Sequence, residues 1–179
     1  MKRVKLWDKE FEISYPNEQI VAAVKEMAVQ MKEDLKGKEP LFLCVLNGCF
    51  MFAADLLKEV ELSDAEVSFV KLASYEGTQT TENIKQLIGL NGDITGRTVV
   101  IVEDIVDSGF TIANLINQVE ERGAGDIKVA TLLFKPEALK KNVKVDYVGL
   151  EIPNDFIVGY GLDYDGRGRN LKDIYTLVQ

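Results

Sequence analysis

The sequence predicts an α/β protein in which a central, mostly parallel sheet is flanked by helices on both faces. Short, continuous apolar runs such as LFLCVL at residues 41–46 are typical of strands buried on both sides. Segments with apolar residues every three or four positions alternate with these runs and predict helices. This alternation favours a parallel sheet with helical crossovers. The length of 179 residues corresponds to about one domain.

The first half of the chain predicts two helices and two strands. After an extended start, one helix opens at Pro16-Asn17 and ends near Lys36-Gly37, because its apolar residues follow helical spacing. The apolar run at residues 41–46 is a strand, and residues 50–60 form the second helix. Alternating apolar residues predict another strand at 65–72.

The second half begins with a predicted hairpin beside the main sheet. It consists of a strand at residues 84–90, an Asn-Gly turn, and a return through Ile94–Arg97. Residues 99–104 form the most apolar strand, and residues 111–122 form a helix that ends at Gly123. Further strands are expected at residues 129–134, 147–152, 157–158 and 175–178.

Composition excludes several classes of function. The net charge of −8 argues against nucleic-acid binding as the main activity. The chain has no histidine, which excludes Ser-His-Asp and Cys-His catalysis and imidazole zinc sites. Cys44 and Cys49 form neither a disulfide framework nor a zinc knuckle and fit a reducing compartment. Without an apolar run of signal-peptide or membrane-span length, we expect a cytoplasmic protein with no membrane partner.

The segment VEDIVDSGFT at residues 102–111 carries the chemistry. Glu103 and Asp104 stand at the carboxyl end of a buried strand and can accept hydrogen bonds from vicinal hydroxyls or hold a hard divalent cation. Ser108, Gly109 and Thr111 open a helix, where hydroxyls, backbone N–H groups and the helix dipole favour a phosphate. Together these features describe a site for a phosphorylated ribose. The ordinary alternative is an N-capping turn with exposed acids at a strand end.

This segment resembles the 5-phosphoribosyl-1-diphosphate (PRPP) signature of the phosphoribosyltransferases. SYEGT at residue 74, Lys135 after a strand, and EIPNDFIVGYGLDYDGRGRNL at residues 151–171 are similar to the hypoxanthine-guanine branch. The resemblance implies a type I phosphoribosyltransferase fold, with one domain over residues 1–179 and a small hood formed by the chain ends. That purine-binding hood would comprise about residues 151–179 and the N-terminal segment.

The resemblance also implies roles around PRPP. The loop that binds the 5′-phosphate would consist of Asp107, Ser108, Gly109, Phe110 and Thr111. Glu103 and Asp104 would face the ribose hydroxyls and Mg²⁺, and Asp163 would help to hold a magnesium ion. Asp107, close to the purine N7, would be the general base, a role open to a carboxylate in a histidine-free site.

Base and diphosphate recognition follow from the same resemblance. Lys135 would donate to the purine O6 and select 6-oxopurines over adenine. Phe156 would stack on the base, and Ile157 would offer backbone groups to its edge. Arg169 would reach the pyrophosphate. Each residue also has an ordinary interpretation, such as a strand-end lysine or a core phenylalanine.

Two loops complete the expected site. Leu46, Asn47 and Gly48 fall where the family has its pyrophosphate loop, which often carries a non-proline cis peptide. This chain departs from the family at two positions: many relatives have Lys in place of Asn47, and some have Lys in place of Phe110. The departures concern side-chain contacts to the diphosphate and across subunits. Ser74 and Tyr75 open a flexible catalytic loop, at about residues 74–83, that closes over the substrates.

The implied activity is transfer of the phosphoribosyl group from PRPP to N9 of hypoxanthine or guanine, which yields IMP or GMP plus pyrophosphate in purine salvage. Mg²⁺ is the implied cofactor, and we expect a homodimer or homotetramer. One alternative is a PRPP- or nucleotide-sensing RNA-binding regulator on the same fold. Another is a phosphoacceptor signalling domain, because an acidic pair and a later strand-end lysine are typical of receivers. The preference among hypoxanthine, guanine and xanthine is open.

Overall fold

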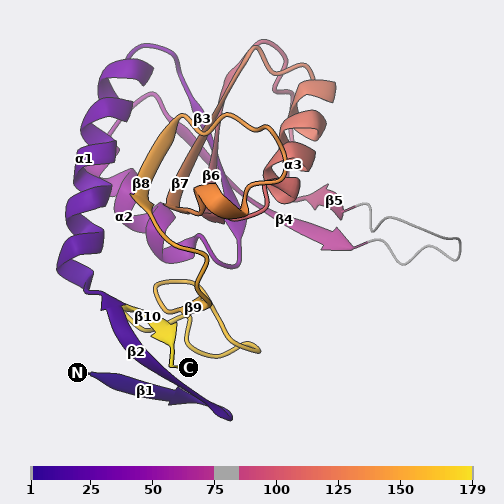
Figure 1. Cartoon of the computed structure of the whole chain (residues 1–179). Coiled ribbons are helices and arrows are strands. Elements are labelled where there is room, and N and C mark those ends of the chain that lie inside the picture. Colours follow the sequence, from indigo (N-terminus) through magenta and orange to yellow (C-terminus); the bar gives the residue numbers. More distant parts are fainter. Residues whose placement is uncertain (1, 75–84, 179) are drawn as a thin grey trace, which may run out of the picture.

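The computed structural model describes residues 2–74 and 85–178 and is built around a six-stranded sheet of order β5-β4-β3-β6-β7-β8 (Figure 1). Neighbouring strands run parallel, except that β5 pairs antiparallel with β4. The strands are β3 (Leu41–Leu46), β4 (Glu66–Ser74), β5 (Lys85–Ile88), β6 (Thr98–Val106), β7 (Asp126–Phe134) and β8 (Tyr147–Glu151). The predicted mostly parallel sheet is confirmed.

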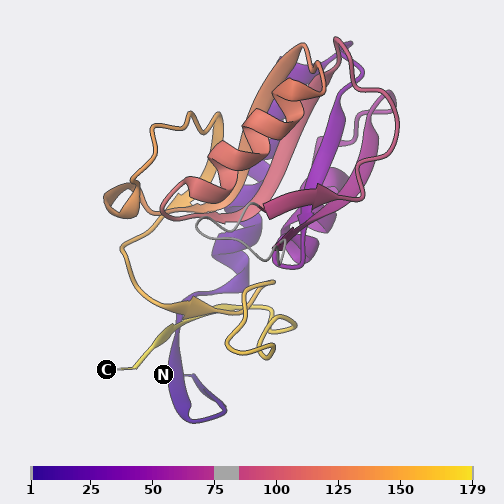
Figure 2. The same ribbon diagram turned by 90° about the vertical axis from the view of Figure 1, so that its right-hand side faces the viewer.

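Helices cover both faces of this sheet, which Figure 2 shows from one face, with one helix in front of the strands and the others behind them. The helices α1 (Asn17–Leu35) and α2 (Phe50–Val60) lie on one face, and α3 (Phe110–Glu121) lies on the other. Residues of β3 alternate between the two cores: Phe42 packs with α1 and α2, whereas Leu43 packs with α3. In the described part of the chain, no helix combines the length and apolar character needed to span a membrane.

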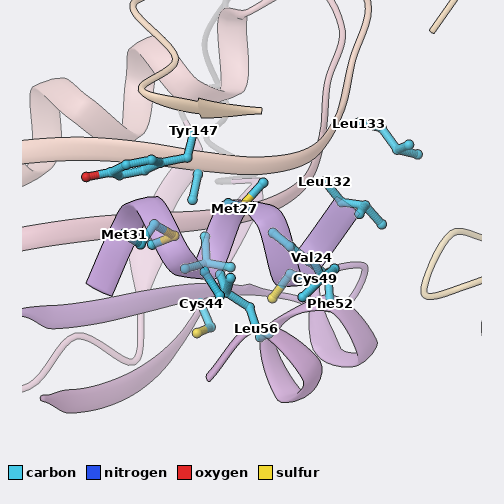
Figure 3. Close-up of a cluster of buried hydrophobic side chains, with 14 of the residues drawn as sticks. Val24, Met27, Met31, Cys44, Cys49, Phe52, Leu56, Leu132, Leu133 and Tyr147 are labelled. Carbon is cyan, nitrogen blue, oxygen red and sulfur yellow. The ribbon is translucent and has the colours of Figure 1, made fainter. Parts of the chain in front are cut away.

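Both cysteines belong to the core between α1, α2 and the sheet (Figure 3). Cys44 and Cys49 are fully buried, near Phe52 and Leu56. Burial raises the pKa of the Cys44 thiol to about 12 and also raises that of Cys49. A thiol that stays protonated at neutral pH is a poor nucleophile, so both cysteines serve packing.

The two ends of the chain form a second, antiparallel sheet of order β1-β2-β10-β9, which lies beneath the carboxyl edge of the main sheet in Figure 1. We call this sheet, together with residues 152–156 that lead into β9 and the loop at residues 159–173, the hood. Its strands are β1 (Arg3–Leu6), β2 (Lys9–Tyr15), β9 (Ile157–Val158) and β10 (Ile174–Leu177). The sequence predicted only an extended start, whereas β1 and β2 pair as a hairpin.

The predicted return strand at Ile94–Arg97 is wrong. β5 pairs with β4, and the chain then turns: the backbone N–H and hydroxyl of Thr95 donate to the Asp93 carboxylate at 2.9 and 2.6 Å. Ile94 is buried in the core on the α3 side. Local side-chain hydrogen bonding by Asp93 therefore favours a turn over a strand here.

Candidate active site

The carboxyl ends of β3, β6 and β7 meet at the edge of the main sheet that faces the hood (Figure 1). Ligands of open α/β sheets bind at this edge. The loop after β3 holds Asn47 and Gly48, the loop after β6 begins at Asp107, and Lys135 follows β7. Parallel pairing therefore gathers predicted site residues that lie about ninety positions apart in the sequence.

The acidic pair on β6 is buried. Glu103 and Asp104 are 7% and 8% exposed. The Asp104 N–H donates to the Glu103 carboxylate at 3.3 Å, and the Ile105 N–H donates to the Asp104 carboxylate at 2.9 Å. Burial raises the pKa of Asp104, while hydrogen bonds from these neighbours and the charge of Arg169 oppose that rise. Two adjacent carboxylates in a desolvated position favour a bound cation or hydroxyl donors.

A cavity of about 220 Å³ lies between the acidic pair and the start of α3. Gly109 precedes the helix with φ +81°, and no side chain in the described structure caps its first turn. The first N–H groups of a helix need acceptors, and an anion supplies them. The lining residues are Glu103, Asp104, Ile105, Val106, Asp107, Ser108, Gly109, Thr111 and Ile112. The predicted phosphate-loop residues, apart from Phe110, thus line one cavity.

The loop after β3 touches both the acidic pair and the hood. The Leu46–Asn47 peptide is cis. A Cβ atom on Gly48 would overlap the Asp104 carboxylate, and one on Gly161 would overlap the Gly48 carbonyl oxygen. Only glycine permits these close approaches, so the Gly48 backbone packs directly against the Asp104 side chain and the Gly161 backbone packs directly against Gly48.

Arg169 is held by the hood loop. It donates to the Gly161 carbonyl at 2.7 Å and forms a 2.6 Å ion pair with Asp163, which also accepts the Gly166 N–H at 2.7 Å. Within residues 2–74 and 85–178, no three acidic, cysteine or histidine side chains gather in a way that could hold a metal ion. The structure therefore does not bring Asp163 into one ligand group with the acidic pair.

Lys135 connects the sheet edge to the hood. Its side chain is buried, its ammonium donates to the Asp155 carbonyl at 2.8 Å, and it lies 3.5 Å from the Asp107 carboxylate. Asp107 itself is half exposed, with 51% of its side chain accessible. The predicted base and the predicted O6 donor are thus neighbours, at the mouth of the site.

Phe156 directly follows Asp155, the residue whose carbonyl accepts the hydrogen bond from Lys135. It is 47% exposed and packs in the hood against Phe11 and Tyr164, at centroid distances of 6.1 and 5.8 Å. The ring is thereby fixed from behind while nearly half of its surface faces outward. Such a surface suits stacking on a planar base.

Ile157 lies on the outer strand of the hood sheet, with its side chain buried. It pairs with Thr176, and the flanking Leu177 N–H donates to the Phe156 carbonyl at 2.9 Å. Antiparallel pairs alternate between bonded and non-bonded positions. The backbone groups of Ile157 therefore point away from β10, toward the outer edge of the sheet.

Sequence reasoning missed several residues at the site. The Lys141 ammonium lies 5.0 Å from the centroid of the exposed Phe110 ring. The backbone N–H of Lys141 donates to the Ser108 carbonyl at 3.2 Å. No local pattern marks Lys141, whereas the Gly-Tyr-Gly run could have indicated Gly161. Ser74 ends β4, and Tyr75 lies outside the described residues, so the predicted closing loop is not tested.

Comparisons with known proteins identify the family of the chain. Residues 13–165 match the phosphoribosyl transferase domain. The chain is 40% identical over 168 residues to a hypoxanthine-guanine phosphoribosyltransferase of Streptococcus thermophilus, covering 93% of each chain. It is 40% identical over 167 residues to one from Mycobacterium bovis, covering 89% of this chain and 82% of that protein.

Solved structures give the same result for the fold. A hypoxanthine phosphoribosyltransferase from Staphylococcus aureus superposes with a TM-score of 0.85 at 34% identity, over 93% of this chain and 91% of that one. A mutant of the Trypanosoma cruzi enzyme, in a ternary substrates complex, gives 0.84 at 35% identity, over 93% and 95% of the two chains. The predicted type I fold is confirmed, and the chain belongs to the phosphoribosyltransferase family, in its hypoxanthine-guanine branch.

Proposed function

We propose that this enzyme transfers the 5-phosphoribosyl group of PRPP to N9 of hypoxanthine or guanine, giving IMP or GMP and pyrophosphate. The observation that carries the proposal is the contact of buried Lys135 with both Asp107 and the Asp155 carbonyl. This contact supports the assignment of Asp107 as the base and Lys135 as the O6 donor, because Asp107 lines the same cavity as Glu103 and Asp104.

We assign residues 102–111 to PRPP binding. Ser108, Gly109 and Thr111 would bind the 5′-phosphate at the start of α3, and Glu103 and Asp104 would accept hydrogen bonds from the ribose hydroxyls. Asn47, Gly48 and Arg169 would bind the diphosphate. The cavity of about 220 Å³ between the acidic pair and α3 supports this assignment.

The acidic pair also fits Mg²⁺, which binds through one or two carboxylates and completes its shell with water and phosphate oxygens. Glu103 and Asp104 would hold it, and Asp163 would have to exchange its ion pair with Arg169 to join them. When bound, the ion neutralises charge on the departing diphosphate.

In the proposed reaction, the lone pair of N9 forms a bond to C1′ of the ribose as the C1′–oxygen bond to diphosphate breaks. The diphosphate leaves with that electron pair, and Asp107 accepts the proton that the base loses. Positioning both substrates across one sheet edge turns the transfer into a step within a single complex. The loop at about residues 74–83 is proposed to close over them.

Selection of the base is assigned to three groups. The Lys135 ammonium would donate to the O6 of a 6-oxopurine, and the amino group of adenine cannot accept that bond. Phe156 would stack on the base, and the outward backbone groups of Ile157 would pair with its edge. We propose that residues 1–179 act as one domain, in which the hood binds the purine.

The test is incubation of the purified protein with PRPP, Mg²⁺ and, separately, hypoxanthine, guanine, xanthine and adenine, with nucleotides separated by chromatography. IMP and GMP without AMP are expected, and xanthosine monophosphate formation ranks the third base. Bound PRPP with no nucleotide from any base would refute the proposal. An RNA gel shift that survives physiological salt would then favour the regulator.

We also propose a homodimer or homotetramer in the cytoplasm. Large exposed apolar side chains on α2 and β4 support self-association, namely Phe50, Val67 and Phe69, which are 42%, 45% and 49% exposed. Sedimentation of the active enzyme should give two or four times the chain mass of 20.0 kDa. An active species at the single-chain mass would contradict this.

A further inference from the structure

Tyr160 connects the hood loop to α2, the helix that follows the loop at residues 46–48. It lies between Gly159 and Gly161 with φ +47°, and its side chain is only 1% exposed. Its hydroxyl donates to the carboxylate of Asp55 on α2 at 2.5 Å, across 105 positions of sequence. We propose that Tyr160 is a positioning residue, whose bond to Asp55 sets the spacing between Arg169 and the loop at residues 46–48 that together receive the diphosphate. This inference rests on the proposed function.

On the hood side, Tyr160 is adjacent to the contacts that hold Arg169. Gly161 donates its N–H to the Arg169 carbonyl at 2.9 Å, and its carbonyl accepts a hydrogen bond from the Arg169 guanidinium at 2.7 Å. The Tyr160 N–H donates to the Leu171 carbonyl at 2.8 Å. A shift of the Tyr160 side chain would therefore move Gly161 and, with it, the Arg169 guanidinium.

On the opposite side, Asp55 is rigidly connected to the loop after β3. The α2 helix begins directly after Cys49, and the Ala53 N–H donates to the Cys49 carbonyl at 2.7 Å. Since Gly161 packs against Gly48 without room for a Cβ atom, the loop and the hood meet at that point. The Tyr160–Asp55 bond is a second connection between the same two segments, and two connections fix an angle that one leaves free.

The charges support a persistent bond. Burial and the Asp55 carboxylate both raise the pKa of Tyr160, so its hydroxyl stays a donor across the neutral range. Burial alone would raise the pKa of Asp55, but hydrogen bonds from Lys58 and Tyr160 bring it below its ordinary value. A hydrogen bond to a charged acceptor is short and directional.

The experiment compares Tyr160→Phe with Tyr147→Phe as its control, because both tyrosine hydroxyls donate to an aspartate on a helix. Tyr147 is 2% exposed, and its hydroxyl donates to Asp34 on α1 at 3.0 Å, on the α1 side of β8. Each variant removes one buried tyrosine–carboxylate bond. KM for PRPP, KM for hypoxanthine, kcat and the calorimetric Kd for pyrophosphate with Mg²⁺ are measured for both.

Tyr160→Phe should raise KM for PRPP and Kd for pyrophosphate about tenfold, because a displaced Arg169 would lose about one charged hydrogen bond to the diphosphate. KM for hypoxanthine should stay within about twofold, because Phe156 and Lys135 do not depend on this bond. Tyr147→Phe should change none of these constants. Asp55→Asn, which keeps an acceptor oxygen, should recover part of the pyrophosphate affinity that Asp55→Leu loses.

Unchanged pyrophosphate binding in Tyr160→Phe would overturn the inference, and so would equal losses in both tyrosine variants. A parallel rise in KM for hypoxanthine would indicate general loosening of the hood and would also overturn it. Failure of the proposed function is distinguishable: the unmutated enzyme would then form no nucleotide, while pyrophosphate calorimetry would still decide the role of Tyr160.

Discussion

The carboxyl edge of the main sheet and the hood contribute different things to one site. The edge carries the acidic pair, the proposed general base and the proposed phosphate loop within residues 103–111, on a strand and helix buried in two apolar cores. The hood instead joins residues 3–15 to residues 157–177. The proposed chemistry therefore lies in a short local segment, whereas the proposed purine recognition combines Lys135 after β7 with residues of the hood.

The main sheet and the hood also differ in the interactions that stabilise them. The hood's own core is a small cluster around Phe11, Val158 and Tyr175. Polar contacts supplement it: Lys2 pairs with Asp173 at 2.7 Å, Tyr164 donates to Asp8, and the Arg167 guanidinium stacks 3.5 Å from the Trp7 ring centroid. Substitutions at the edge should therefore change kcat, and those in the hood should change KM or pH response.

Asp107→Asn tests the edge most directly. Removal of a general base at constant shape should lower kcat by about 10²- to 10⁴-fold. Asp126→Asn is the matched control. The carboxylates of Asp107 and Asp126 are both about half exposed and lie 3.5 and 3.6 Å from a lysine ammonium. Asp126, however, begins β7, at the end of the strand opposite to Lys135. Steady-state kinetics decides: equal effects in both variants would remove Asp107 from the mechanism.

Gly48→Ala should have the next largest effect, a loss of kcat/KM of about 10²-fold, because the new methyl group overlaps Asp104 and displaces the loop. The control is Gly37→Ala, which has φ +72° but no atom within 4 Å of the added methyl group. It should cost about 1 kcal/mol of stability and no activity. Circular dichroism must show both variants folded, and full activity in Gly48→Ala would contradict the contact.

Lys135→Met tests the connection between the two regions. Loss of the O6 donor should raise KM for hypoxanthine by about 10-fold or more and weaken the discrimination against adenine, with less change in KM for PRPP. Lys128→Met, on the same strand but beside Asp126, serves as the control. Competition assays with mixed bases measure the ratio of kcat/KM for hypoxanthine to kcat/KM for adenine. A selectivity that stays intact would exclude Lys135 from base recognition.

Asp173→Asn should have the smallest effect on turnover and a clear effect on the acid response of the hood. Hydrogen bonds from Lys2 and the Asn17 N–H lower the pKa of Asp173. Its stabilising contribution is therefore complete above its unfolded pKa of about 3.9 and is lost as pH falls through the lower folded value.

The single tryptophan, Trp7, lies in the hood, so its fluorescence reports on that region. In the unmutated protein, the signal should change below about pH 4. Asp173→Asn should lose the part of that pH dependence that does not come from Asp8, whose pKa the Tyr164 hydrogen bond also lowers. KM for the base should rise less than about threefold. The control is Asp93→Asn. The pKa of Asp93 is also lowered, by hydrogen bonds from Thr95, but Asp93 lies in a turn outside the hood. Identical acid titrations in all three proteins would refute this role of Asp173.

Local patterns were sufficient for the main sheet. Apolar runs and helical spacing predicted β3, α2 and α3 to within a residue or two, because each is specified by neighbouring side chains. The same reasoning failed at Ile94–Arg97, where the turn favoured by Asp93 replaces a strand. It also overlooked the β1–β2 hairpin, whose partner strand β10 lies some 160 residues away.

By itself, the sequence determined the α/β alternation, the acidic pair at the end of a buried strand, and the Ser-Gly opening of the next helix, since their residues are contiguous and their chemistry is local. Only the tertiary structure decided that Lys135 reaches both Asp107 and Asp155, that Gly161 packs on Gly48, and that Tyr160 bonds to Asp55. The physical reason is that parallel strand order and the closure of the chain ends bring these groups together. Neither is encoded in the spacing of adjacent residues.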